Sequence, residues 1–242
     1  MTAPQPAPAF EPIAQWRAHE YVAEQIRRQI GLRLIPTAGS LPSERDLAAL
    51  FGVGRATVQQ AVRLLEAERL VESRRGRHGG TFVIAPSSDD LAMDYLLVRL
   101  RRDAARIEEA LVFRGHIETV AAELAATTRR KAELREVVTA CARAESAESD
   151  VDFMMHDTQF HLAVARAGRN RFVTDAVERL RLVLNDALTA LPDSDLWHER
   201  SRREHIPIRD AIEARDGAAA RAAMAEHLAS TERSIHALLV AL

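Results

Sequence analysis

The stretch LPSERDLAALFGVGRATVQQAVRLLEAERL, residues 41–70, decides the fold expected for the first third of the chain. Ser43 followed by Asp46 resembles a helix capping box, although with Asp where Glu is usual, and predicts a short helix over about 44–51. A glycine ends that helix, and apolar residues at helical spacing predict a second helix over about 55–68. Two short helices joined by a turn of about three residues form a helix-turn-helix.

The segments that flank this stretch complete a small domain. Apolar positions at helical spacing predict a helix over 14–33. The runs 70–73 and 81–84 are strand-like, and the glycines between them predict a hairpin with a basic tip. We therefore expect a winged helix-turn-helix, followed by a polar linker.

The rest of the chain shows only helical patterns. Pro207 falls inside one expected helix, so that helix should start near Ile206 or bend there. The expected helices cover roughly 90–102, 104–127, 130–147, 151–167, 170–191, 196–215 and 217–240. The predicted fold class is mainly α, with an N-terminal winged helix-turn-helix domain plus a C-terminal all-α helical bundle. The expected divisions are a flexible tail over 1–12, the winged domain over 13–85, a linker over 86–90 and the helical domain over 91–242.

Composition limits the class of protein. The chain has 242 residues, 47% of them hydrophobic, which is enough for one large domain or two ordinary ones. Cys141 is the only cysteine, so a disulfide within the chain is excluded and a reducing compartment is indicated. The N-terminus lacks the features of a signal peptide, and no apolar stretch approaches the ~20 residues that span a bilayer. We expect a soluble, cytoplasmic protein.

The second helix of the helix-turn-helix carries polar side chains suited to DNA. Opposite its apolar stripe lie Arg55, Thr57, Gln59, Gln60 and Arg63. Side chains of this kind can hydrogen-bond base edges in the major groove. Residues 1–86 hold 11 Arg against 8 Asp and Glu, whereas the rest of the chain is acidic. An ordinary solvated helix face is the alternative, but the order of helix, turn, helix and basic wing favours double-stranded DNA as a partner.

A second group of polar residues lies in the helical part. Asp157 and His161 interrupt the otherwise apolar phrase VDFMMHDTQFHLAVARAGRN and, at i and i+4, share a helix face. His205 and His227 follow on later helices, with His198 as a competing candidate. Three imidazoles and a carboxylate suit a divalent metal such as zinc, nickel or manganese. Spacing alone leaves open an active site, a metal site or a satisfied polar pair in a core.

The sequence from LPSER to GGTFV resembles the winged helix-turn-helix of the GntR family of bacterial transcription regulators. The match covers about 70 residues, and the spacing holds between these two motifs without a gap. In that family, DNA is contacted by the Arg of the LPSER segment, by the start of the recognition helix and by the wing. The resemblance therefore assigns DNA contacts to Arg45, Arg55, Ala56, Thr57, Gln59, Arg77, His78 and Gly79.

Some positions depart from the usual pattern of that family. Gly54 replaces a Ser and weakens the N-cap of the recognition helix by a few tenths of a kcal/mol. Ala56 replaces a Thr, and Gln59 and Gln60 replace an Arg-Glu pair. Because Arg favours guanine and Gln favours adenine, we expect an operator that differs from the usual half-site. Arg69 stands where a helix-ending Gly is usual, which predicts a different exit from the helix.

Residues 108–240 resemble FCD, the helical effector-binding domain of the FadR subfamily of GntR regulators. The matching phrases are FRGHIETVAAELA, DTQFHLAVARAGRN and EHIPIRDAIEARDGAAARAAMAEHL. The metal-binding members carry one Asp and three His, which correspond here to Asp157, His161, His205 and His227. The resemblance implies a divalent metal cofactor, with zinc favoured and nickel or manganese as alternatives.

The same resemblance implies a ligand-responsive transcription regulator, with repression as the commoner behaviour. Residues 91–242 would bind a small organic acid near the metal and join two copies into a homodimer that binds a palindromic operator. Arg114, Arg181 and Asn185 are the candidate effector-binding residues, although Arg114 could instead pair with Glu118 as part of the structure.

Two rival functions stay open. The metal itself could be the signal, or a metal with open coordination positions could hydrolyse a substrate. The sequence has no H-E-x-x-H motif, nucleophile elbow or phosphate loop, so we do not expect an enzyme.

Overall fold

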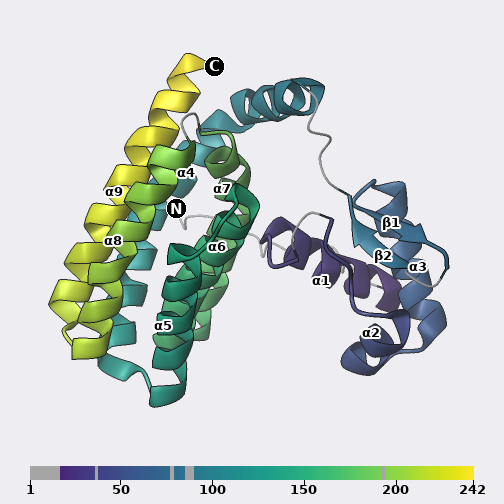
Figure 1. Ribbon diagram of the computed structural model, residues 1–242, viewed down its shortest axis with the longest axis horizontal. Helices are drawn as coiled ribbons and strands as arrows, with labels where there is room; N and C mark the ends of the chain where they lie inside the picture. Colours follow the sequence, from purple (N-terminus) through teal and green to yellow (C-terminus); the bar gives the residue numbers. More distant parts are fainter. Residues whose placement is uncertain (1–16, 36–37, 77–78, 85–89, 192–193) are drawn as a thin grey trace, which may run out of the picture.

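The computed structural model describes residues 17–35, 38–76, 79–84, 90–191 and 194–242, which form two parts (Figure 1). The first part contains α1 (Ala18–Gly31), α2 (Glu44–Phe51), α3 (Arg55–Ala67), β1 (Val71–Arg74) and β2 (Gly80–Val83). The second contains α4 (Asp90–Thr128), α5 (Lys131–Glu145), α6 (Asp150–Ala167), α7 (Arg171–Thr189), α8 (Ser194–Ala214) and α9 (Gly217–Ala241). The expected tail over 1–12, and the linker over 86–90 apart from Asp90, lie outside the described residues. None of the described helices is long and apolar enough to cross a membrane.

The first part is the winged helix-turn-helix that the sequence predicts. The backbone N–H of Asp46 donates to Ser43 Oγ at 3.2 Å, and Gly52 ends α2 with a φ of 65°, in the left-handed region that favours glycine. The apolar faces of α1, α2 and α3 share one core with the hairpin. The strands pair antiparallel with Val71 opposite Val83, each one residue away from its expected range.

The end of α3 corrects one expectation. Arg69 has a φ of 58°, so it adopts the left-handed conformation that glycine usually supplies at this place. The N–H of Leu70 donates to the carbonyl of Leu65 at 2.9 Å, a bond typical of a left-handed helix end. The prediction of a different exit was therefore wrong, because the backbone keeps the usual exit although its residue is not glycine.

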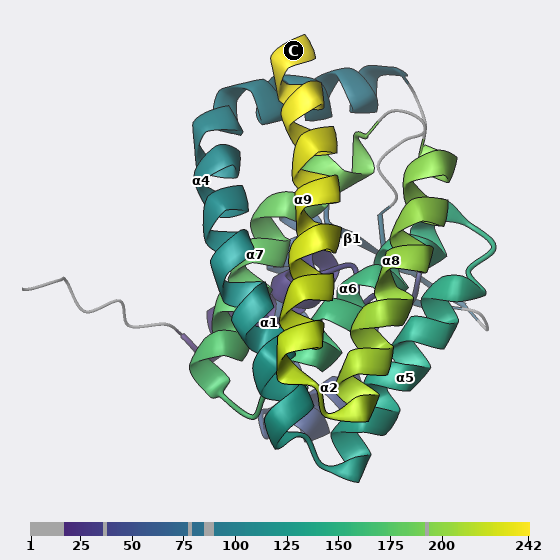
Figure 2. The same cartoon turned by 90° about the vertical axis from the view of Figure 1, so that its left-hand side faces the viewer.

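The second part is an all-α bundle, so the predicted fold class is confirmed. The two helices expected over 90–102 and 104–127 are wrong, because α4 is one bent helix of 39 residues. Its first turns cross the end of the bundle near the C-terminus, and its remaining turns run alongside α9 (Figure 2). No Gly or Pro occurs in α4 before Gly115, so no residue of the helix-breaking types separates the two expected segments.

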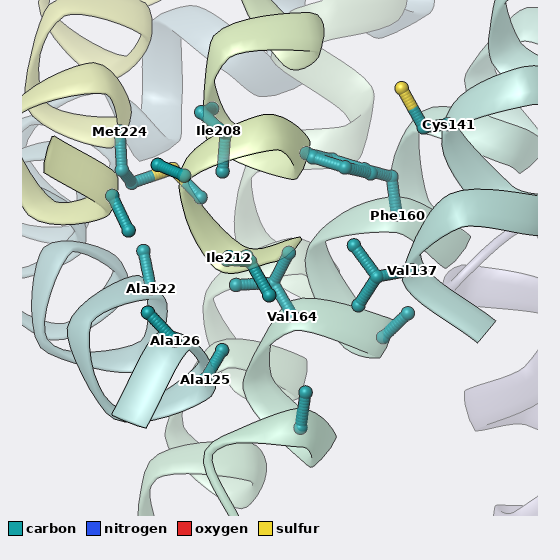
Figure 3. Packing of buried hydrophobic residues seen from close by; sticks show 14 of the residues in the cluster. Ala122, Ala125, Ala126, Val137, Cys141, Phe160, Val164, Ile208, Ile212 and Met224 are labelled. Carbon is teal, nitrogen blue, oxygen red and sulfur yellow. The ribbon is translucent and has the colours of Figure 1, made fainter. Parts of the chain in front are cut away.

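A tightly packed core joins five helices of the bundle (Figure 3). Ala122 of α4, Val137 of α5, Phe160 of α6, Ile212 of α8 and Met224 of α9 are all fully or almost fully buried in it. The ring of Phe160 also stacks on an imidazole of α8, with centroids 4.1 Å apart. The apolar core therefore borders directly on buried polar side chains of the bundle, of which this imidazole, that of His205, is one.

Helix α8 corrects a further expectation. It begins at Ser194 and continues through Pro207, so a start near Ile206 was wrong. Its C-terminal end is held by Arg129, which is 7% exposed and donates to the carbonyls of Ile212 at 3.0 Å and Glu213 at 2.7 Å. These carbonyls have no partner inside the helix, and a cation is favourable at a helix C-terminus.

Candidate metal centre and DNA-binding surface

Four candidate ligands come together from three helices inside the bundle. Helix α6 supplies Asp157 and His161, α8 supplies His205 and α9 supplies His227. All four are buried, and one donor atom from each lies within 4.8 Å of the others. The i, i+4 spacing aligns the first two on α6, and the packing of α8 against α9 brings the other two toward them.

The distances between these donor atoms fit a small divalent ion. His161 Nε2 lies 3.3 Å from His227 Nε2 and 3.8 Å from Asp157 Oδ1. His205 Nε2 lies 3.4 Å from the same carboxylate oxygen. Zinc bonds of about 2.0–2.1 Å in a tetrahedron separate the ligand atoms by about 3.3–3.4 Å. These three distances are therefore close to the spacing that such an ion requires, and the other pairs of donor atoms lie within 4.8 Å.

Two carboxylates determine which imidazole nitrogens face the centre. His161 Nδ1 lies 2.5 Å from Glu118 Oε2, and His227 Nδ1 lies 2.9 Å from Glu204 Oε2. Because a carboxylate accepts hydrogen bonds, each Nδ1 carries a proton and donates it. In the neutral rings, the two Nε2 lone pairs then face each other, an arrangement that a cation between them would stabilise. A carboxylate partner of this kind is typical of metal-bound histidines.

Burial favours the neutral imidazoles of His161 and His227, whereas neighbouring charges keep the Asp157 carboxylate ionised. Burial lowers the pKa of His161, against the opposing effect of Glu118. It also lowers the pKa of His227 well below its ordinary value, and the neighbouring imidazoles add to that effect. Burial alone would raise the pKa of Asp157, but the Arg181 guanidinium together with the imidazoles of His205 and His161 outweighs it, and the net pKa is well below the ordinary value. These protonation states are the ones that bind metal.

Two buried arginines near the centre have N–H groups without a hydrogen-bond partner among the described residues. Arg181 Nη2 donates to Asp157 Oδ2 at 2.5 Å and to Thr158 Oγ1 at 2.8 Å. Arg114 Nε donates to Glu118 Oε1 at 2.7 Å. Among the described residues, Arg114 Nη1 and both Nε and Nη1 of Arg181 find no hydrogen-bond partner. Leaving buried donors unpaired is costly, so these atoms mark a place for an acceptor.

Asn185, the third residue expected in an effector pocket, has a different partner. Its Nδ2 donates to the carbonyl of Gly31 at the end of α1, at 3.0 Å. The amide group therefore joins the bundle to the winged part of the molecule.

Helix α3 exposes the side chains that the resemblance assigns to DNA. Gln59 Nε2 donates to Glu44 Oε2 of α2 at 2.9 Å, which orients the amide on the protein surface. The side chain of Arg45 on α2 is 74% exposed. On α3, Arg55, Ala56 and Gln59 are exposed and Thr57 is half-buried.

The wing requires glycine at its base. Arg77 and His78 lie outside the described residues, but Gly79 beside them is described. Its N–H donates to the carbonyl of Gly76 at 2.9 Å. A Cβ on Gly79 would lie 2.5 Å from the carbonyl oxygen of Arg74, so a side chain there would force the backbone to move.

Both parts of the chain match known families. The FCD domain family matches residues 109–230, and the gntR family of bacterial regulatory proteins matches residues 18–83. The HTH-type transcriptional repressor NanR of Salmonella typhimurium is 30% identical over 238 residues, which cover 94% of this chain and 88% of that protein. The chain belongs to the GntR family. NanR of Citrobacter rodentium is 29% identical over 237 residues, with the same coverage of both chains.

Solved structures show the same fold as this GntR-family protein. A GntR transcriptional regulator from Rhodococcus sp. RHA1 matches with a TM-score of 0.51 and 21% identity, over 90% of this chain and 97% of that chain. Escherichia coli McbR/YncC matches with a TM-score of 0.51 and 15% identity, over 92% and 99%. The proteins of this family that resemble the chain are transcription regulators and not enzymes. As a member of the family, this protein is therefore a transcription regulator that binds DNA.

The other histidines that the structure of this GntR regulator describes do not join the four convergent donors. His198, the competing candidate, has its Nδ1 3.0 Å from Asp150 Oδ1, and its ring packs on Phe153. His156 points elsewhere on α6, with its Nδ1 3.1 Å from Gln159 Oε1.

The sequence patterns do not reveal the residues that support the four ligands. Glu118 contacts His161 across 43 residues of sequence, and no spacing rule connects two separate helices in this way. Glu204 supports His227, and its place directly before His205 is the one signal that could have drawn attention to it. Ser201 is a further neighbour that the sequence did not indicate, and its Oγ lies 3.5 Å from Asp157 Oδ1.

Proposed function

We propose that this GntR regulator is a repressor that binds a palindromic operator as a homodimer and responds to a small organic acid held near a metal ion. The observation that carries the proposal is the convergence of four buried donor atoms beside buried arginine N–H groups without partners. The similarity to NanR, which is named a repressor, favours repression over activation. In this proposal, residues 13–85 bind DNA and residues 91–242 hold the metal, the effector and the second copy, in the cytoplasm.

Zinc is the metal that the four ligands favour. Imidazole nitrogens suit zinc and nickel, whereas manganese prefers oxygen ligands and water. The supporting observation is the spacing of 3.3–3.8 Å among the measured donor atoms, which is near the edge length of a tetrahedral zinc site. A bound zinc ion would supply a Lewis acid that attracts an oxygen of the effector.

A carboxylate is the effector group that the neighbouring arginines favour. The free N–H groups of Arg114 and Arg181 would donate to it, and guanidinium–carboxylate bonds are among the strongest hydrogen bonds in proteins. Arg114 can serve both roles that the sequence allows, because its Nε already holds Glu118 while its Nη1 stays available. Asn185 stays a prediction as an effector residue, because its Nδ2 donates to the carbonyl of Gly31 while its buried Oδ1 has no partner among the described residues.

The operator is bound by α3 and the wing in this proposal. Arg45 is placed to contact a phosphate, and the exposed start of α3 with Gln59 is placed to reach base edges. Arg77, His78 and Gly79 would contact DNA from the wing. Selection of binding sites from random DNA tests the expected shift from the usual half-site, and recovery of the common family consensus at every position would contradict it.

A groove between α4 and α7 is the proposed dimer interface, where a second copy of the chain would bind. Phe113 and Phe172, 49% and 71% exposed, contribute apolar surface to a groove of about 610 Å³. Arg106 and Arg179 line it together with the carboxylates of Glu109 and Asp175. A two-fold axis makes a surface meet itself, so a patch that carries both signs of charge around apolar residues can be self-complementary.

One titration separates the proposal from its rivals. Operator affinity is measured by fluorescence anisotropy with zinc kept saturating, while a panel of small carboxylic acids is added one at a time. We expect at least one acid to weaken operator binding. If no acid acts and removal of zinc by a chelator switches DNA binding, the metal itself is the signal and the organic-acid proposal fails.

A further inference from the structure

Helix α7 contacts both the candidate metal centre and the DNA-binding part. Arg181 is fully buried and reaches inward, where its Nη2 lies 2.5 Å from Asp157 Oδ2. One helical turn later, Asn185 donates to the backbone carbonyl of Gly31 in α1 at 3.0 Å. A movement of α7 that displaces one of these side chains therefore displaces the other.

Apolar packing makes the contact between α1 and α7 close. Leu32, directly after α1, is 1% exposed and packs in a cluster with Val177 of α7 and Leu162 of α6. Leu162 is the chain neighbour of the candidate ligand His161. At Gly31, an added Cβ would lie 2.8 Å from Leu182 Cδ2, so the end of α1 lies directly against α7.

Ion pairs surround this apolar contact. Arg28 of α1 pairs with Glu178 of α7. Arg33 Nη2 lies 3.6 Å from Asp186 Oδ1, and Arg99 of α4 donates to the other oxygen of Asp186 at 2.8 Å. Figure 1 shows α1 extending from the winged part toward the bundle. The end of α1 is thus attached mainly to one helix, which also carries Arg181.

We propose that α7 transmits the occupancy of the metal site to the DNA-binding part, with Arg181 and Asn185 as the positioning residues. The proposal rests on the metal site proposed above. A cation bound by Asp157 would compete with Arg181 for the negative charge of that carboxylate, and would weaken the attraction that fixes α7. A ligand shifts a conformational equilibrium only if its contacts differ between the two states, and the Arg181–Asp157 pair provides such a contact.

Electrostatics between Arg181 and Arg33 give the effect a direction. Burial lowers the pKa of Arg33, Asp186 opposes that shift, and the positive charge of Arg181 lowers the pKa further. When a metal ion takes up the charge of Asp157, the charge of Arg181 is less neutralised and repels Arg33 more strongly. Metal binding should therefore loosen the contact between α1 and α7.

Hydrogen–deuterium exchange of the full chain, with and without saturating zinc, tests this directly. The backbone N–H groups of Leu32, Arg33 and Leu34 donate to carbonyls in the last turn of α1 and report on the contact. In the unmodified chain, zinc should speed their exchange by about 5-fold or more, the lower end of usual coupling between sites. Asn185→Leu should bind zinc with unchanged affinity but lose most of the zinc-dependent difference, because the hydrogen bond from α7 to Gly31 is absent.

Two further variants keep the test decisive. Thr189→Ala should keep the zinc effect, because the partner of the Thr189 Oγ1 among the described residues is the carbonyl of Asn185 in the same helix. Asp186→Asn removes the ion pair to Arg33 at a partly exposed position and should reduce the effect if Asn185→Leu does not fold.

The possible results distinguish failure of the coupling from failure of the metal site. Zinc that binds at one ion per chain but leaves exchange at 32–34 unchanged, or slows it, overturns the coupling and leaves the metal site standing. A chain that binds no zinc overturns both proposals. A zinc effect that survives in both Asn185→Leu and Asp186→Asn overturns the route through α7.

Discussion

Among single residues, His161 gives the most direct test of the metal centre. His161→Ala removes one of four donors and leaves Glu118 buried without its imidazole partner, so we expect stoichiometric zinc binding to be lost. His156→Ala on the same helix removes an imidazole whose hydrogen-bond partner among the described residues is Gln159, and should keep one zinc ion per chain. Metal content after dialysis, measured by mass spectrometry, checks both variants. Stoichiometric zinc in His161→Ala would contradict the assignment of the site.

Glu204 tests whether the carboxylates beside the imidazoles matter. Glu204→Ala removes the acceptor that holds His227 Nδ1, and loss of such a partner typically weakens metal affinity by about 10–100-fold. Glu199→Ala is a matched control, because Glu199 lies on the same helix and, within the described part of the chain, pairs with the exposed Arg203. Competition with a fluorescent zinc chelator measures both affinities, and an equal effect of the two substitutions would show that Glu204 has no special role.

The sequence allowed the four ligands to be named, but not their surroundings. Asp157 and His161 share a helix face, and the resemblance to FCD supplied His205 and His227. The contact of Glu118 with His161 depends on how α4 packs against α6, which no local pattern encodes. Residue type therefore indicated the metal chemistry, whereas helix packing decides which nitrogen is protonated in His161 and His227.

Among the elements, the C-terminal end of α3 should be stabilised by one substitution. Arg69 adopts a φ of 58°, and a non-glycine residue in the left-handed region costs about 1–2 kcal/mol. Arg69→Gly removes this cost, but glycine is freer in the unfolded chain, which offsets part of the stabilisation. We therefore expect Arg69→Gly to raise the free energy of unfolding by about 0.5–1 kcal/mol. Arg63→Gly, in the middle of the same helix, should lower it by about 1 kcal/mol. Urea unfolding measures both, and the same sign for both changes would refute the explanation.

Helix α4 shows that the boundaries of elements were harder to predict than their type. Its first turns pack Leu96 and Leu97 against one core cluster, while its later turns pack Ala122 and Ala126 into another. Ile107 and Leu111, after the break expected at residue 103, pack into the same cluster as Leu96 and Leu97, so the change of cluster comes later in the helix and does not account for that break. The winged part has no such change, and its helix-turn-helix was predicted to within one residue at each helix end.

At the scale of the whole molecule, the contact between the two parts was invisible in the sequence. Leu32 looks like the end of an ordinary amphipathic helix, yet it is buried among residues of α4, α6 and α7. Gly31 and Asn185 are 154 residues apart, and neither belongs to a recognisable motif. Patterns in the sequence described each part, whereas the contact depends on shape and charge that only the folded chain brings together.

The proposed dimer groove leads to a prediction about the assembled molecule. In a two-fold dimer, Phe172→Glu would place a carboxylate on each side of the apolar contact, where burying a charge without a partner is costly. Because the Phe172 side chain is 71% exposed, the fold of the chain should not change. Sedimentation equilibrium at micromolar concentration should show a dimer for the unmodified protein and a mass of 26.9 kDa for the variant.

DNA binding should follow the assembly state. The Phe172→Glu variant should lose most of its affinity for the palindromic operator, because two linked winged parts gain from binding both half-sites together. Its affinity for a single half-site should match that of the unmodified protein, since the winged part is untouched. Val240→Glu, at a 74% exposed position on α9 outside the groove, should leave both mass and operator affinity unchanged. A Phe172→Glu protein that remains dimeric, or an unmodified protein that is monomeric and still binds operator as one copy, would show that this groove does not join two copies.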